Sequence, residues 1–210
     1  MEIFELTVGP KFQTNCYIVK SELGHGVCID PGDEPEKIAA KAKAEGVNIR
    51  YILLTHGHYD HIGGVTELKR MFPEAKSCVM AEDLDICKNP ALVDNSTVAP
   101  IDPDMLMSDG DIVKVDELSF KYMATPGHTK GSAIILCGDK MFSGDTVFSR
   151  GCGRTDYYGG STGEMRSSLK KIGNLEGDYE IFTGHGPGTS LEIERYANMF
   201  MRKAMGLSVL

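Results

Sequence analysis

This sequence of 210 residues lacks several features that would place a chain in a specialised class. It has no tryptophan and no CxxC pair. Disulfide frameworks belong mainly to short secreted domains, so we expect reduced thiols in a cytoplasmic protein. The six cysteines are scattered: Cys16, Cys28, Cys78, Cys87, Cys137 and Cys152.

Long apolar runs and basic stripes are also missing. No apolar run has the length needed to cross a bilayer, and residues 1–6 carry acid where a signal peptide needs base. The formal charge is −8, whereas nucleic-acid binders usually cluster basic residues against phosphates. We therefore expect a cytoplasmic protein without a membrane or nucleic-acid partner, and the sequence leaves its oligomeric state open. An anionic substrate is still compatible, because bound metal ions would reverse the local field.

The composition that is present suits an ordinary globular chain, with 41% hydrophobic and 25% charged residues. No repeat or linker marks a boundary, so we expect a single domain over 1–210. Blocks of strand-like segments alternate with helical ones, which predicts a layered α/β fold rather than an all-β barrel. Strands are expected at 2–8, 16–20, 27–29, 51–54, 77–80, 112–115, 118–124, 132–137, 140–142 and 179–183. Helices are expected at 35–45, 64–72, 161–172 and 191–205, a turn at 24–26, and a short helix followed by loop over 81–109.

The histidines are not distributed at random. Five of the six lie in glycine-flanked loops directly after predicted strands, and three of them fall in one cluster with an aspartate: His56, His58, Asp60 and His61. In extended backbone, residues two apart project to the same side, so His56 and His58 share a direction. A single histidine in such a loop would be explained more simply, either as part of a solvated polar loop or as a buried residue with a hydrogen-bond partner. The cluster favours metal ligands, and His/Asp ligation is typical of open catalytic sites.

Three further segments place a histidine or an aspartate at the end of a predicted strand. They carry His128, Asp145 and His185. Each alone would be an ordinary turn with a polar residue. Together with the cluster they give seven candidate metal ligands at strand ends, where α/β layers commonly hold their sites.

These residues stand in motifs that resemble the metallo-β-lactamase superfamily, and specifically a short glyoxalase II-like member. The motifs follow the family's order across most of the chain, from Asp30 to Pro187. They are THGHYDHIGG at 55–64, PGHTKGS at 126–132, SGDTVF at 143–148, GCGRTD at 151–156 and GHGP at 184–187.

The resemblance implies a four-layer αββα sandwich with metals at one edge of its two sheets. It implies that His56, His58 and His128 hold one ion, that Asp60, His61 and His185 hold a second, and that Asp145 bridges them. The implied cofactors are two Zn²⁺ ions, with iron or manganese as other candidates. Two such ions about 3.5–4 Å apart can share a water and lower its pKa. The resulting hydroxide would attack a carbonyl carbon, with Asp60 binding metal and orienting the nucleophile.

The implied activity is a thioesterase acting on S-D-lactoylglutathione or a related small acyl-thiol. A full glyoxalase II carries a helical C-terminal domain that helps to hold glutathione, whereas only about 25 residues follow His185 here. Arg154, Tyr157 and Tyr158 follow the GCGRTD turn, and we expect them to bind substrate, Arg154 through a carboxylate and the tyrosines as a wall. The alternative is a structural salt bridge for Arg154 and tyrosines that cap the core.

Two other functions remain. Persulfide dioxygenases share these motifs but use one iron, held by the equivalents of His56, His128 and Asp145 in a two-His-one-carboxylate site. A metal-binding scaffold without activity is disfavoured by the complete ligand set.

A secreted β-lactamase is disfavoured by Asp145, because the best-known ones carry cysteine there. A nuclease of the superfamily is disfavoured by the acidic charge and by the lack of room for an RNA-binding insertion.

Overall fold

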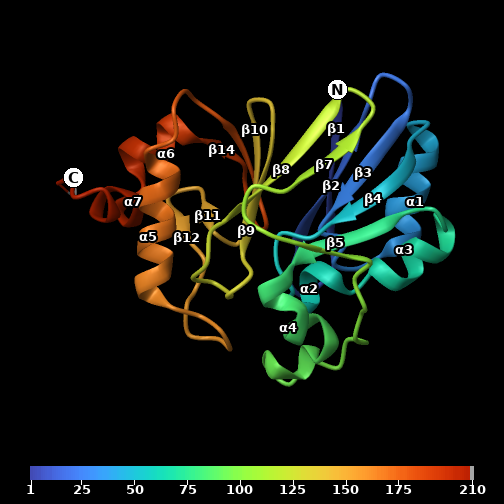
Figure 1. The fold of residues 1–210 in the computed structure, drawn as a ribbon, viewed down its shortest axis with the longest axis horizontal. Coiled ribbons are helices and arrows are strands. Elements are labelled where there is room, and N and C mark those ends of the chain that lie inside the picture. Colours follow the sequence, from blue (N-terminus) through green and yellow to red (C-terminus); the bar gives the residue numbers. More distant parts are fainter. Residues whose placement is uncertain (209–210) are drawn as a thin grey trace.

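The computed structural model describes residues 1–208, which form two sheets packed face to face with helices outside each sheet (Figure 1). The first sheet has the strand order β1-β2-β3-β4-β5-β6 and runs parallel from β3 to β6. Its strands are β1 (Glu2–Val8), β2 (Thr14–Lys20), β3 (His25–Ile29), β4 (Asn48–Leu53), β5 (Lys76–Met80) and β6 (Met105–Met107).

The second sheet has the order β14-β13-β10-β9-β8-β7, and only its β10 and β13 pair in parallel. Because β8 and β10 both run antiparallel to β9, the strands β8, β10 and β13 share one direction. The strands are β7 (Ile112–Val115), β8 (Leu118–Ala124), β9 (Ala133–Cys137), β10 (Lys140–Gly144), β13 (Glu180–Thr183) and β14 (Thr189–Ser190). A separate two-stranded ribbon joins β11 (Val147–Phe148) to β12 (Gly151–Cys152).

Helices cover the outer faces of both sheets. The first half of the chain supplies α1 (Pro35–Ala44), α2 (Tyr59–Ile62), α3 (Val65–Met71) and α4 (Leu84–Lys88), with 3-10 turns η1 (Ala81–Asp83) and η2 (Pro90–Leu92). The second half supplies α5 (Thr162–Gly173), α6 (Leu191–Ala197) and α7 (Met199–Ala204). In Figure 1, α1 and α3 lie on one side of the sheets and α5 to α7 on the other.

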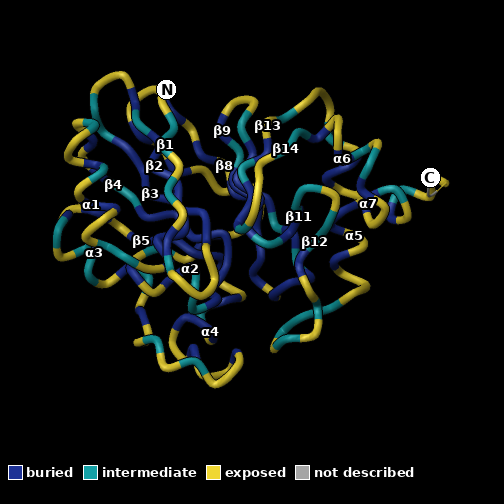
Figure 2. The backbone as a smooth tube through the Cα atoms, turned by 180° about the vertical axis from the view of Figure 1, so that it is seen from behind, coloured by how far each residue is buried: buried dark blue, intermediate teal, exposed yellow. Residues whose placement is uncertain are grey.

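Three apolar clusters hold these layers together, and Figure 2 shows much of the backbone in the middle of the molecule as buried. Ile52 and Leu68 belong to the cluster between the first sheet and its helices. Phe120 and Phe142 belong to the cluster shared by the two sheets. Leu169 belongs to the cluster under α5 to α7. The predicted αββα layering is therefore confirmed, and hydrophobic burial on both faces of each sheet maintains it.

Some local predictions were wrong. The turn expected at 24–26 lies earlier, because His25 already pairs with Asn48 in β3. The loop expected before residue 109 contains β6, a short edge strand beside β5. The single helix expected over 191–205 is two helices, because Asn198 leaves helical geometry and caps the second one through bonds from Phe200 N and Met201 N.

No helix within residues 1–208 has the length and apolar character needed to span a membrane.

Candidate metal centre

The candidate ligands converge because four strands end at the same edge of the two sheets. In the first sheet, the parallel strand β4 leads into His56 through Thr55. In the second, β8, β10 and β13 share one direction and lead into His128, Asp145 and His185. The carboxyl ends of strands that run the same way meet at one edge, where backbone turns leave space for side chains. The helix α2, which the sequence did not predict, adds Asp60 and His61.

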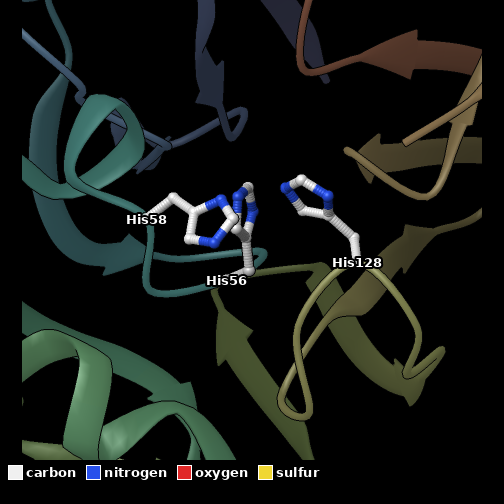
Figure 3. Close-up of side chains that lie close together, drawn as sticks. All are labelled: His56, His58 and His128. Carbon is white, nitrogen blue, oxygen red and sulfur yellow. The ribbon is translucent and has the colours of Figure 1, made fainter. Parts of the chain in front are cut away.

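The first group of ligands is a triad of buried imidazoles, His56, His58 and His128, with one candidate ligand atom from each lying within 4.8 Å of the others. Their ring centroids are 4.5–4.9 Å apart. Figure 3 shows His56 and His58 on one loop and His128 reaching toward them from the opposite loop. His56 and His58 follow β4 of the first sheet, whereas His128 follows β8 of the second. The triad is therefore assembled from both sheets.

The second group joins Asp60, His61 and His185, again with candidate ligand atoms within 4.8 Å of one another. His185 Nε2 lies 3.3 Å from Asp60 Oδ2 and 3.3 Å from His61 Nε2. His61 is fully buried, whereas the His185 side chain keeps 27% of its surface exposed. This second group therefore lies closer to solvent than the first.

Asp145 lies between the two groups. Its Oδ1 is 3.4 Å from His61 Nε2, and its Oδ2 is 3.4 Å from His128 Nε2 and 3.6 Å from His185 Nε2. One carboxylate thus faces both groups, which is the placement that the bridging role requires.

Four of the candidate ligand atoms fit a cation because they are buried and lack hydrogen-bond partners. Among the side chains that the structure describes, four buried nitrogen or oxygen atoms have no hydrogen bond: Nε2 of His56, His58 and His128, and Oδ1 of Asp145. Each buried polar atom without a partner costs about 1–3 kcal/mol. Imidazole nitrogens and carboxylate oxygens that point into one space are the donor set preferred by zinc and iron.

The electrostatics differ between the two groups. Burial and the neighbouring His128 lower the pKa of His58 to about 3, and burial together with the other histidines holds the pKa of His56 well below its ordinary value. Both imidazoles are thus neutral, the form that binds metal. Burial would also lower the pKa of His61, but the carboxylates of Asp60 and Asp30 outweigh it and raise that pKa.

Buried partners orient the ligands from behind, and sequence reasoning missed them. Asp30 accepts hydrogen bonds from His61 Nδ1 at 3.0 Å and from the Thr55 backbone N–H and hydroxyl at 2.8 and 2.7 Å. Such outer partners fix the tautomer and direction of a ligating imidazole. The available signal was the position of Asp30, directly after the predicted strand at 27–29.

Backbone carbonyl groups orient two other histidines. His185 Nδ1 lies 3.1 Å from the carbonyl oxygen of Phe12, and His128 Nδ1 lies 2.7 Å from that of Arg154. The loop between β1 and β2 also leads into Thr14, whose hydroxyl donates to Asp60 at 3.3 Å. The sequence gives no signal for these contacts, because two of the acceptors are main-chain oxygens, which every residue has.

A cavity of about 420 Å³ opens over the ligands. Aromatic side chains form much of its wall, from loops that are distant in sequence: Phe12, Tyr59, Phe148 and Tyr157. Its volume lies within the range of small-molecule sites, about 300–1,000 Å³.

Two of the three predicted substrate-binding residues line this cavity, and the third does not. Arg154 lines the cavity, but its guanidinium also forms a two-point ion pair with Asp156, both contacts at 2.7 Å. Tyr157 lines the cavity, with its ring centroid 5.9 Å from that of His58. Tyr158 instead donates its hydroxyl to Asp85 at 2.8 Å, outside the cavity wall.

A sequence profile of the Metallo-beta-lactamase superfamily matches residues 9–185. The chain belongs to this superfamily. The protein named hydroxyacylglutathione hydrolase GloC of Haemophilus influenzae is 32% identical over 214 residues, covering 96% of this chain and 97% of that protein. The hydroxyacylglutathione hydrolase of Aliivibrio salmonicida is 36% identical over 177 residues, covering 84% of this chain and 63% of that longer protein. The match to this superfamily and the similarity to these relatives show that the chain is a metal-dependent hydrolase.

Solved structures show the same fold. The BLEG-1 B3 metallo-beta-lactamase has a TM-score of 0.88 at 29% identity, with 95% of this chain and 99% of that one covered. TTHA1623 in a di-iron-bound form has a TM-score of 0.83 at 33% identity, with 94% and 99% covered. ETHE1 from Myxococcus xanthus, at 24% identity and a TM-score of 0.80, covers 100% of this chain and 92% of that one and supports the fold alone.

Proposed function

We propose that this metal-dependent hydrolase holds two metal ions and cleaves small acyl-thioesters of the S-D-lactoylglutathione type. The observation that carries the proposal is the position of Asp145, whose carboxylate oxygens lie 3.4–3.6 Å from imidazole nitrogens of both ligand groups. A single ion would need only one of these groups. His56, His58 and His128 would hold the first ion and Asp60, His61 and His185 the second.

When bound, the ions would activate a water molecule as hydroxide and stabilise negative charge on the substrate oxygen and the leaving thiolate. The protein's own residues prepare the site for this chemistry. The low pKa of His58 keeps an imidazole lone pair available at neutral pH. Asp60, held by the Thr14 hydroxyl, would bind metal and orient the nucleophile.

The cavity supports a small substrate with an apolar part. Its aromatic wall would pack against the acyl group or the thiol, while Arg154 and Tyr157 would border the entrance. Arg154 Nη1 donates to the Tyr157 hydroxyl at 2.9 Å, so the two side chains would act as one unit. We also propose that Tyr158, which follows Tyr157 directly but lies outside the cavity wall, contacts a part of the substrate that extends beyond the cavity.

The relatives support the thioester. The name hydroxyacylglutathione hydrolase is carried by a Haemophilus protein that matches this chain over 97% of its own length. A chain of this size is therefore associated with glutathione thioesters in at least one relative. We also propose that the protein acts in the cytoplasm, where its six free thiols, five of them buried, would stay reduced.

A second candidate, a mononuclear iron persulfide dioxygenase, has one observation in its favour. His56, His128 and Asp145 lie together as two histidines and a carboxylate, the set that suits non-haem iron. Iron does not by itself favour a single ion, however, because TTHA1623 has this fold in a di-iron-bound form.

Metal analysis of protein purified without added metal separates the candidates. We expect about two zinc ions per chain together with hydrolysis of S-D-lactoylglutathione, measured by the release of free thiol. About one iron per chain with oxygen uptake on glutathione persulfide would overturn the proposal. Rapid hydrolysis of a chromogenic β-lactam without thioesterase activity would also overturn it, and would align the chain with the BLEG-1 enzyme.

A further inference from the structure

A buried carboxylate outside the ligand set joins the two loops that carry the first group of ligands. Asp83 ends the turn η1 after β5, at the carboxyl edge of the first sheet, and its side chain is fully buried. Its Oδ2 accepts hydrogen bonds from Gly57 N at 2.8 Å and from Thr129 Oγ1 at 2.7 Å, and its Oδ1 accepts one from Gly131 N at 2.6 Å.

These donors stand next to the ligands. Gly57 separates His56 from His58, and Thr129 directly follows His128. One loop follows β4 of the first sheet and the other follows β8 of the second, so Asp83 connects loops that are distant in sequence. One other hydrogen bond, from Ala133 N to Thr55 O at 2.9 Å, also joins these two segments.

The glycines make this close approach sterically feasible. A Cβ atom at Gly131 would lie 2.6 Å from Asp83 Cγ, and one at Gly57 would lie 3.1 Å from the Asp83 carbonyl oxygen. Real Cβ contacts of 2.6 Å do not occur without displacement of the neighbour. The glycines of both histidine loops thus leave the space that Asp83 occupies.

Burial of a carboxylate is costly, and here its three hydrogen bonds come from neutral donors. If Asp83 served only to fill space, an apolar side chain of similar volume would stabilise the fold at least as well. What an apolar side chain could not do is hold two backbone N–H groups and a hydroxyl from separate loops at fixed positions.

We propose that Asp83 is a positioning residue that fixes His56 and His58 relative to His128, so that the first metal site is assembled before metal binds. This inference rests on the proposed metal centre. Residues that orient metal ligands from outside commonly change metal affinity by about 10–100-fold when replaced. Asp83 acts on the backbone of both loops at once, so its loss should move all three imidazoles.

The test compares zinc affinities of metal-free proteins by titration against a coloured chelator. In Asp83→Asn one amide hydrogen must face a former donor, and we expect the tightest zinc site to weaken about 10–100-fold. Asp104→Asn is the matched control, because Asp104 also accepts bonds from a backbone N–H and a hydroxyl, both of Ser77, but away from the histidine loops. We expect this control to keep the wild-type affinity.

A cobalt-substituted sample adds a spectroscopic readout, because the visible absorption of Co²⁺ depends on the arrangement of its ligands. We expect altered bands in Asp83→Asn and unchanged bands in Asp104→Asn.

Thr129→Val removes a single donor to Asp83 and gives a milder variant should Asp83→Asn not fold. We expect Thr129→Val to weaken zinc binding as well, but by less than Asp83→Asn.

Wild-type zinc affinity and cobalt bands in Asp83→Asn, or in Thr129→Val where only that variant folds, would overturn the positioning role. Equal weakening in Asp104→Asn would also overturn it, because the effect would then follow general destabilisation. Uptake of only one ion by the wild type would contradict the binuclear proposal, yet the comparison between variants would still test Asp83 on that one site.

Discussion

Replacement of Asp30 by asparagine tests how far the site depends on a residue that lies behind the ligands. Asp30 accepts three buried hydrogen bonds, two from Thr55 and one from His61. It has a φ of 51°, a left-handed conformation that asparagine also tolerates, so the substitution adds little backbone strain. The shape of the side chain is kept, and only one oxygen is replaced by an amide nitrogen.

The magnitude follows from these bonds. In the less costly orientation of the amide, its nitrogen takes the place of Oδ1, and only the Thr55 N–H loses its acceptor, at a cost of about 1–3 kcal/mol. The other two bonds lose a charged acceptor, about 1 kcal/mol each, so the total is about 3–5 kcal/mol. For a chain of this size each kcal/mol lowers Tm by about 2–4 °C, which predicts a decrease of about 6–20 °C.

The assay is thermal unfolding of the metal-free protein in excess chelator. We propose that residues 1–210 form one domain, so a single transition is expected. Asp139→Asn is the control, because Asp139 is an exposed carboxylate that pairs with Lys140 at the surface. A Tm within about 2 °C of the wild type for Asp30→Asn would refute the reasoning, since the smallest expected loss, about 3 kcal/mol, should lower Tm by about 6 °C.

Three further predictions concern the ligands, the cavity and the second helical layer. Asp145→Ala should lower metal content and thioesterase activity together, and an active variant with full metal content would refute the bridging role. Tyr157→Ala should lower kcat/KM for S-D-lactoylglutathione about two- to tenfold through loss of aromatic contact, and by more than Tyr158→Ala; equal effects would contradict the cavity wall. Asn198→Ala should reduce the free energy of unfolding by about 1–3 kcal/mol, measured by urea denaturation, because the cap of α7 is lost; an unchanged midpoint would contradict this.

The strand pattern was predictable where strands have a buried face. The segment 118–124 alternates buried and exposed residues over most of its length, and it forms β8 as expected. Short edge strands were not predictable, because the three residues of β6 carry no recognisable alternation and gain their hydrogen bonds only from β5. The break at Asn198 was not predictable from the sequence, because a single asparagine within a helix-like segment does not reveal whether its side chain caps a helix or points to solvent.

The sequence by itself determined the ligand types and their motifs. The spacing of His56, His58, Asp60 and His61 is a local property, and the motifs around His128, Asp145 and His185 are equally local. Tertiary structure alone brings these motifs together, since His61 and His185 are 124 residues apart and their ring nitrogens lie 3.3 Å from each other. It also decides which groups stand behind the ligands, as Asp30 and Asp83 do, because a buried hydrogen bond depends on the packing of distant strands and leaves no periodic trace in the chain.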